Sequence, residues 1–125
     1  MKEAGLEPQV VRTSGDVSVN RPHFETVFEN RKVDGAIAVR DSIAVSFLNT
    51  AIDHGKQVPE QLQVAGFQNT KYATLARPQL TAIDIPVYDI GAVSMRLLTK
   101  LMQQKGADNT RIILPHHLME RNSTK

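Results

Sequence analysis

The chain has 125 residues, enough for one domain with its own hydrophobic core, and its hydrophobic fraction of 41% and charged fraction of 22% are those of an ordinary soluble globular protein. Its formal net charge is +2 with Lys and Arg scattered along the sequence, which excludes the clustered basic surface of a nucleic-acid-binding domain. The lack of cysteine excludes disulfides and cysteine-based zinc sites and fits a cytosolic protein, and neither a signal peptide nor an apolar run of ~18 residues points to export or to a membrane.

The N-terminal part is expected to contain a helix end, a strand and a helix. Met1–Leu6 is typical of the last turns of a helix that ends at Gly5, so we expect the chain to be a fragment of a larger protein. Gln9–Thr13 predicts a short strand. Arg21–Asn30 predicts a helix, because Pro22 suits its first turn and its apolar residues share one face at helical spacing.

A buried strand followed by an amphipathic helix is predicted next. Ala36–Val39 is a continuous apolar run, which favours a strand buried on both faces, as in a parallel sheet. The helix is predicted over Asp41–His54, with Asp41 or Ser42 as its cap and Gly55 closing it. Its apolar residues form two neighbouring stripes, Ile43, Phe47 and Ala51 beside Ala44, Leu48 and Ile52.

The next strand is predicted over Leu62–Ala65 and is expected to stop at Gly66. Phe67, Gln68 and Asn69 then follow, where the chain leaves the sheet. Hydrogen-bonding side chains at such a point suit the rim of a ligand crevice, which in open α/β sheets lies outside the carboxyl ends of the strands.

The C-terminal part continues the alternation. The predicted elements are a short helix over Lys71–Ala76, an extended segment over Leu80–Ile85, the longest helix over Asp89–Gln104, and short strands over Arg111–Leu114 and Leu118–Glu120. Strands that alternate with helices predict an α/β protein with a parallel, doubly wound sheet.

The sequence lacks the motifs of most common active sites. It contains no glycine-rich phosphate-binding motif and no serine-hydrolase elbow, and its four histidines have no partners at metal-ligand spacing. Asp84 and Asp89 straddle Pro86, where surface or hinge carboxylates are favoured over a glycosidase pair. Arg40 and Asp41 open a helix directly after a buried strand, so that Asp41 either caps the helix or contributes to a site for an anion or polar ligand.

Five segments, in order, resemble the LacI/GalR family of transcriptional regulators. Asp34–Ala44 resembles that family's strand followed by "ND-x-x-A", and Gly55–Phe67 resembles its "G-x-x-V-P-x-D-h-x-h-x-G-F-D", where h is apolar. The other matching segments are Arg77–Ile83 ("x-P-x-L-T-T-h"), Gly91 with Ala92 ("G-x-x-A") and Leu114–Thr124 ("L-P-x-x-L-x-x-R-x-S-T"). Together they extend over essentially the whole chain.

The resemblance implies a periplasmic-binding-protein-like effector domain, in which two α/β subdomains clamp a small ligand. Residues 1–86 would form part of the C-terminal subdomain, residues 87–115 would help to complete the N-terminal subdomain, and residues 116–125 would be the return strand and tail. The DNA-binding head would lie outside this chain, which is then an incomplete piece of the fold with exposed strand edges.

The resemblance also implies ligand-facing positions, which are Val17, Arg40, Asp41, Gln68 and Asn69. Relatives often place a stacking aromatic at Val17, the "ND" pair at Arg40 and Asp41, and a carboxylate at Gln68. Arg40 in place of Asn and Gln68 in place of Asp change both charge and hydrogen bonding, so the identity of the ligand does not carry over. The forms "G-F-x-N" and "L-T-x-I-D-I" resemble maltose-operon repressors and suggest a maltose-type sugar.

The function that this resemblance implies is a non-enzymatic, cytoplasmic sensor of a small molecule, a sugar in particular, within a transcriptional repressor. No cofactor, metal or catalytic residue is expected, and operator DNA would be contacted only through the absent head. A homodimer would form through Asp41–His54 and Thr70–Ala76, unless their apolar residues are intramolecular core. The alternatives are a periplasmic sugar-binding receptor of a transport system and a flavodoxin-like enzyme.

Overall fold

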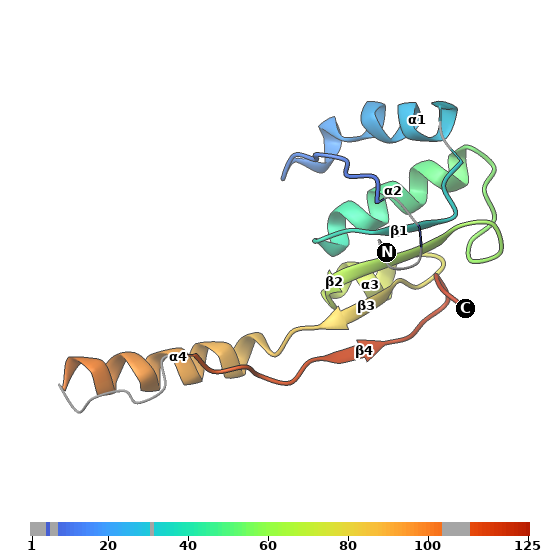
Figure 1. Ribbon diagram of the computed structural model, residues 1–125. Coiled ribbons are helices and arrows are strands. Elements are labelled where there is room, and N and C mark those ends of the chain that lie inside the picture. The colour runs from blue at the N-terminus through green and yellow to red at the C-terminus, as the bar shows by residue number, and fades with distance from the viewer. Residues whose placement is uncertain (1–4, 6–7, 31, 104–110) are drawn as a thin grey trace.

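The computed structural model describes residues 5, 8–30, 32–103 and 111–125, and Figure 1 shows a small sheet with a helical layer on one side and one helix that projects away from it. The elements are η2 (Val17–Val19), α1 (Arg21–Asn30), β1 (Gly35–Ile37), α2 (Asp41–Asp53), β2 (Gln63–Gln68), α3 (Lys71–Leu75), β3 (Thr81–Asp84), α4 (Val87–Met102) and β4 (His117–Met119).

The strands form one sheet in the order β1-β2-β3-β4. β1, β2 and β3 are parallel, as expected, whereas β4 is antiparallel to β3, so the expectation of a wholly parallel sheet is wrong for the last strand. The chain leaves the sheet after Asp84 at the end of β3 and returns to the same edge, where His117 pairs with Asp84. A strand that enters at the edge where its neighbour ends must run in the opposite direction.

The strand β2 does not stop at its glycine, as the sequence had suggested. It runs from Gln63 to Gln68, and Gly66 is buried within it, paired with Ala82. A Cβ atom on Gly66 would lie 2.5 Å from Oδ1 of Asp41 and 2.8 Å from Cδ2 of Leu80. The glycine therefore allows neighbouring side chains to approach the strand, and it does not end the strand.

The core lies between α2 and the sheet, and α1 packs on α2 (Figure 1). The predicted stripes of α2 are buried within this chain, apart from Ile52, which is 41% exposed. This settles one alternative left by the sequence, because the stripe is intramolecular core. The rings of Phe24 and Phe47 meet edge to face, with their centroids 5.2 Å apart, and so join α1 to α2.

Three expectations for strands are wrong. Gln9–Thr13 and Arg111–Leu114 form no strand, and their side chains are exposed apart from the half-buried Leu114. β1 is shorter than the predicted Ala36–Val39 and is not buried on both faces, because Ile37 is 77% exposed. β1 is an edge strand of the described sheet, so it has a neighbour on one side alone. Apolar composition predicts burial only where a second layer covers the residue.

The helices agree better with the sequence. α1 has the predicted bounds, α2 and α3 end one residue early, and Gly55 follows α2 with a left-handed φ of +75°. α4 begins at Val87, before the expected Asp89. Gly5 also has a positive φ, +67°, but the helix expected before it lies outside the described residues.

The helix α4 stands apart from the rest of the molecule and runs beside the segment that leads into β4 (Figure 1). None of its residues is buried. Its apolar residues Ile90, Val93 and Leu97 line an open groove of about 360 Å³ together with Ile112 and Leu114. A search of the described helices finds none with the length and apolar character needed to cross a bilayer.

Candidate functional site

The carboxyl ends of β1, β2 and β3 lie at one edge of the sheet, because these strands are parallel and in register. This edge carries Arg40 shortly after β1, Gln68 at the end of β2 and Asp84 at the end of β3. Ligands of open α/β sheets bind at such an edge. The edge is therefore the candidate site.

Arg40 supplies a guanidinium with no partner of its own at this edge. It is the N-cap residue of α2, its side chain makes no cap hydrogen bond, and the residue is exposed. Its Nη1 lies 3.4 Å from the position that a Cβ atom on Gly15 would take, so the side chain lies against the loop that precedes Val17. The guanidinium forms no hydrogen bond or ion pair with another residue of the described part of the chain. Its five N–H donors are available to an oxygen-rich ligand.

Asp41 is buried at 1% exposure and faces the inside of the protein. Its Oδ2 accepts hydrogen bonds from the backbone N and from Oγ1 of Thr70, the latter at 2.9 Å. Its Oδ1 is buried against Gly66 and finds no hydrogen-bond donor among the residues that the structure describes. Asp41 lies in the first turn of α2 and does not cap it, so the expected capping role of Asp41 or Ser42 is wrong. Its carboxylate instead holds the loop after β2 in place through these bonds to Thr70.

The end of β2 and the loop after it have an unusual backbone. Gln68 has a φ of +119° and Asn69 a φ of +52°, a region that residues with side chains seldom adopt. Gln68 is exposed, and its amide makes no hydrogen bond within the described part of the chain. Asn69 is half-buried and uses both ends of its amide, since Nδ2 donates to Oδ1 of Asp84 at 3.2 Å and Oδ1 accepts from Nη2 of Arg121 at 2.6 Å. Of these two neighbours, Gln68 is the one with free hydrogen-bonding groups.

Val17 begins η2 and lies half-buried at a different surface. It lines an open groove of about 380 Å³ between η2, α1, α2 and α3, with Arg21, Ser46 and Tyr72 among the other lining residues. Asp16 precedes it, and the Ser18 hydroxyl and then the Ser18 amide donate to that carboxylate and lower its pKa.

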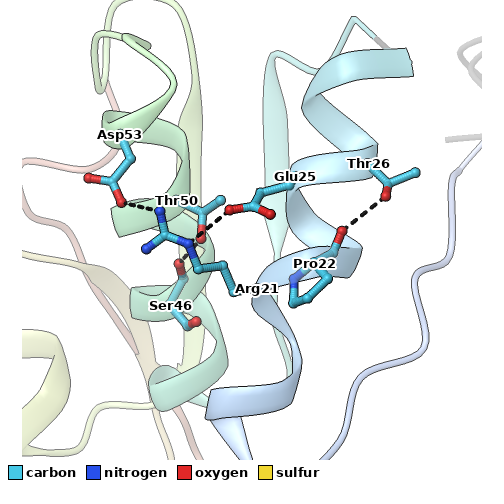
Figure 2. Close-up of polar contacts among 7 residues, drawn as sticks. All are labelled: Arg21, Pro22, Glu25, Thr26, Ser46, Thr50 and Asp53. Carbon is cyan, nitrogen blue, oxygen red and sulfur yellow. Dashed lines mark hydrogen bonds and ion pairs between the residues drawn. The ribbon is translucent and has the colours of Figure 1, made fainter.

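Arg21 ties the two helices beside this groove together, as Figure 2 shows. Its Nε donates to Glu25 at 2.9 Å on α1, and its Nη2 pairs with Asp53 at 2.8 Å on α2. These bonds, first that to Glu25 and then that to Asp53, raise the pKa of Arg21. The pairs are solvent-exposed, so their contribution to stability is small.

The five positions implied by the resemblance are thus only partly brought together. Arg40 and Gln68 share the edge, Asp41 and Asn69 support it from inside, and Val17 lines the neighbouring groove. No group of three or more histidine, aspartate or glutamate residues within the described ranges could hold a metal ion.

The sequence did not identify three residues that shape this edge, which are Thr70, Asp84 and Arg121. Asp84 was detectable in principle, because it ends a strand parallel to β2 and so must lie beside Gln68. Arg121 belongs to the terminal motif, but the contacts of Thr70 and Arg121 gave no signal, because their partners lie 29 and 52 residues away along the chain.

Comparison with known proteins identifies the family to which this fold belongs. The sequence matches the periplasmic binding protein-like domain family over residues 1–124. It is 44% identical over 92 residues to catabolite control protein A of Staphylococcus epidermidis, an alignment that covers 74% of this chain and 28% of that protein.

Solved structures agree with this match. Transcription regulator CcpA of Lactococcus lactis superimposes with a TM-score of 0.88 at 32% identity, over 99% of this chain and 46% of that one. A LacI family transcriptional regulator from Arthrobacter sp. FB24, in complex with lactose, gives a TM-score of 0.84 at 25% identity over 99% of this chain and 48% of that one. The chain thus spans less than half the length of these relatives. It belongs to the periplasmic binding protein-like family and is part of an effector-binding domain of the LacI/GalR regulators.

Proposed function

We propose that this chain is the effector-binding and dimerisation part of a LacI-type transcriptional repressor that senses a sugar. The observation that carries the proposal is a pair of exposed side chains, Arg40 and Gln68, at the carboxyl edge of the parallel strands, which have no hydrogen-bond partner within the described ranges. A neutral amide both donates to and accepts from hydroxyl groups, and a guanidinium donates to several oxygens at once. A sugar offers hydroxyl groups in both roles, and the similar Arthrobacter regulator is in complex with lactose.

The same proposal assigns the parts of the chain to subdomains. Residues 1–86 would belong to the C-terminal subdomain, residues 87–115 would help to complete the N-terminal one, and residues 116–125 would return to the first. The projecting α4, with its uncovered apolar groove, suits a segment that needs further chain to pack against. A sugar clamped between the subdomains would favour one relative orientation, provided that it binds the two orientations with different affinity. A maltose-type sugar is one specific form of the proposal.

Sugar binding by the purified chain is tested by isothermal titration calorimetry with maltose, lactose and glucose, and with adenine as a non-sugar. We expect saturable heat with at least one of the sugars and none with adenine. Gln68→Ala should weaken that binding about tenfold or more, the equivalent of about 1.4 kcal/mol. Gln57→Ala is the matched control, because Gln57 lies in the loop before β2, at the other end of the sheet. Binding that Gln68→Ala leaves unchanged would contradict the proposed site.

Dimerisation would use the outer surfaces of α2 and α3. Tyr72 is 47% and Leu75 68% exposed on α3, and Val45 of α2 lines the groove beside Tyr72. Such exposed apolar residues favour contact with a second copy. In sedimentation velocity we expect Tyr72→Asp to shift the chain toward the monomer, whereas Tyr88→Asp, on the projecting α4, should not. Equal dimer fractions in all three proteins would contradict this surface.

The remaining parts of the proposal concern the whole regulator. Operator DNA would be contacted by a domain absent from this chain, and the protein would act in the cytoplasm. We expect no turnover of the bound sugar, since the similar proteins are regulators by name. That likeness also favours a regulator over a periplasmic transport receptor.

A further inference from the structure

We infer that Arg121 is a positioning residue that holds residues 68–70, at the end of β2 and in the loop after it, in place, an inference that rests on the proposed function for the role of Gln68. The guanidinium of Arg121 joins two points of the fold. Its Nη2 donates to Oδ1 of Asn69 at 2.6 Å, and its Nη1 donates to the backbone oxygen of Leu80 at 2.7 Å. One side chain near the end of the chain thereby fixes a residue of the loop after β2.

The hydrogen bonds of Arg121 belong to a series of hydrogen bonds that connects the two ends of β3. Leu80 directly precedes β3, and Asp84 is its last residue. Arg121 donates hydrogen bonds to Leu80 and to Asn69. Asn69 in turn donates to Asp84 through Nδ2, at 3.2 Å. Both ends of the Asn69 amide are therefore occupied, and rotation of that side chain would break a bond on either side.

The loop needs such support because its backbone is strained. Gln68 at a φ of +119° and Asn69 at +52° occupy a region that side chains disfavour, and such residues persist where their surroundings hold them. Asp41 holds the far side of the loop through Thr70, and Arg121 with Asp84 holds Asn69. The side chain of Gln68 has no such bond to any described residue, so its direction depends on its backbone pairing with Asp84 and on these flanking contacts.

Arg121 can act as a fixed point because its own backbone is held. Its backbone N donates to Oγ1 of Thr81 at 2.9 Å, and the same hydroxyl lies 3.2 Å from its carbonyl oxygen. Two residues further along the chain, Ser123 is fully buried and bonds to both β2 and β3. The loop is thus tied to the body of the sheet, and its bond to Asp84 ties it also to the end of β3, where the chain departs toward α4.

Hydrogen exchange at the loop tests this role without any ligand. In Arg121→Met we expect the amides of residues 68–70 to exchange about tenfold faster, while those of residues 44–51 in α2 change less than about twofold. Arg121→Lys keeps one donor and should recover part of the protection. Lys125→Met is the matched control, because it removes one positive charge from the same terminal segment. Unchanged exchange at the loop, or an equal increase in α2, would overturn the inference.

Asn69→Gly gives a second variant in case Arg121→Met folds poorly. Glycine adopts the same positive φ without strain, so the backbone path is retained while the acceptor for Arg121 is lost. We expect faster exchange at residues 68–70, as in Arg121→Met. Protection equal to that of the wild type would show that the bond to Arg121 does not hold the loop.

A binding measurement then relates the loop to the ligand, using whichever of maltose, lactose and glucose binds the wild-type chain. Arg121→Met should weaken binding about as much as Gln68→Ala, and the double variant should lose no more than either alone, since both act through one group. Additive losses would overturn the positioning role. If the wild-type chain binds none of these sugars, the proposed function fails, and the exchange measurement alone decides whether Arg121 holds the loop.

Discussion

At the scale of single residues, the contact between Gly66 and Asp41 shows how a buried carboxylate is accommodated. Oδ1 of Asp41 lies against the backbone of β2 at the one position of the strand that has no side chain. Oδ2 holds Thr70, and hydrogen bonds to a charged acceptor contribute about 1.5–3 kcal/mol each. The glycine is therefore required by packing, since its own φ is not in the left-handed region.

Gly66→Ala should consequently destabilise the chain. The added methyl group would lie 2.5 Å from Oδ1 of Asp41 and 2.8 Å from Leu80, so both side chains must move. Overpacking of this kind costs about 1–3 kcal/mol, which urea unfolding would detect as a lower midpoint. Gly35→Ala is the control, because nothing lies within 4 Å of its Cβ position. Equal midpoints for the two variants would show that the Asp41 contact is not tight.

At the scale of elements, the tail after β4 fastens β2 to β3. Oγ of Ser123 donates to the oxygen of Val64 at 2.6 Å and accepts from the N of Thr81 at 2.8 Å. The backbone of Ser123 adds two more bonds, which its oxygen accepts from the N of Val64 and its N donates to the oxygen of Gln79. Ser123 thus supplies hydrogen-bond partners to backbone groups of β2 and β3 that these parallel strands do not give each other.

Ser123→Ala should weaken this joint while leaving the elements themselves intact. The hydroxyl is fully buried, so its removal leaves the N–H of Thr81 and the oxygen of Val64 short of one partner each. Such a loss costs about 1–3 kcal/mol. Thermal unfolding should show a lower midpoint for Ser123→Ala than for Ser94→Ala, whose hydroxyl is exposed on α4. A midpoint as high as that of Ser94→Ala would mean that the backbone bonds of Ser123 suffice.

At the scale of the whole molecule, stability is unevenly distributed. α2 contributes a large part of the buried core, whereas α4 buries no residue. Helices depend on tertiary packing for most of their stability in proteins. The 125-residue chain therefore joins a packed body to an uncovered helix.

Hydrogen exchange should reveal this difference in the isolated chain. We expect the amides of residues 44–51 in α2 to be protected about a hundredfold or more above those of residues 91–101 in α4, because opening α2 disrupts the core and opening α4 does not. The measurement is repeated at several protein concentrations. Protection of α4 that equals that of α2 and rises with concentration would show that a second chain covers it.

The sequence alone determined that α1, α2, α3 and α4 are helices, that the parallel strands β1, β2 and β3 alternate with them, and which family the chain resembles. It did so because helical periodicity, glycine caps and short motifs are local properties, as α1 and the stripe of α2 show. Its reading of Gly66 as the end of a strand was wrong, and the assignment of individual ligand contacts stays a prediction.

Only the tertiary structure decided what Gly66, Asp41 and Asn69 do, because their partners are distant in sequence. Asp41 meets Thr70 29 residues later, and Asn69 meets Arg121 52 residues later. It also decided the antiparallel direction of β4 and the exposure of β1, which depend on the edge where the chain returns and on which strands have neighbours. Burial and hydrogen bonding across such separations are properties of the assembled fold, and no local pattern encodes them.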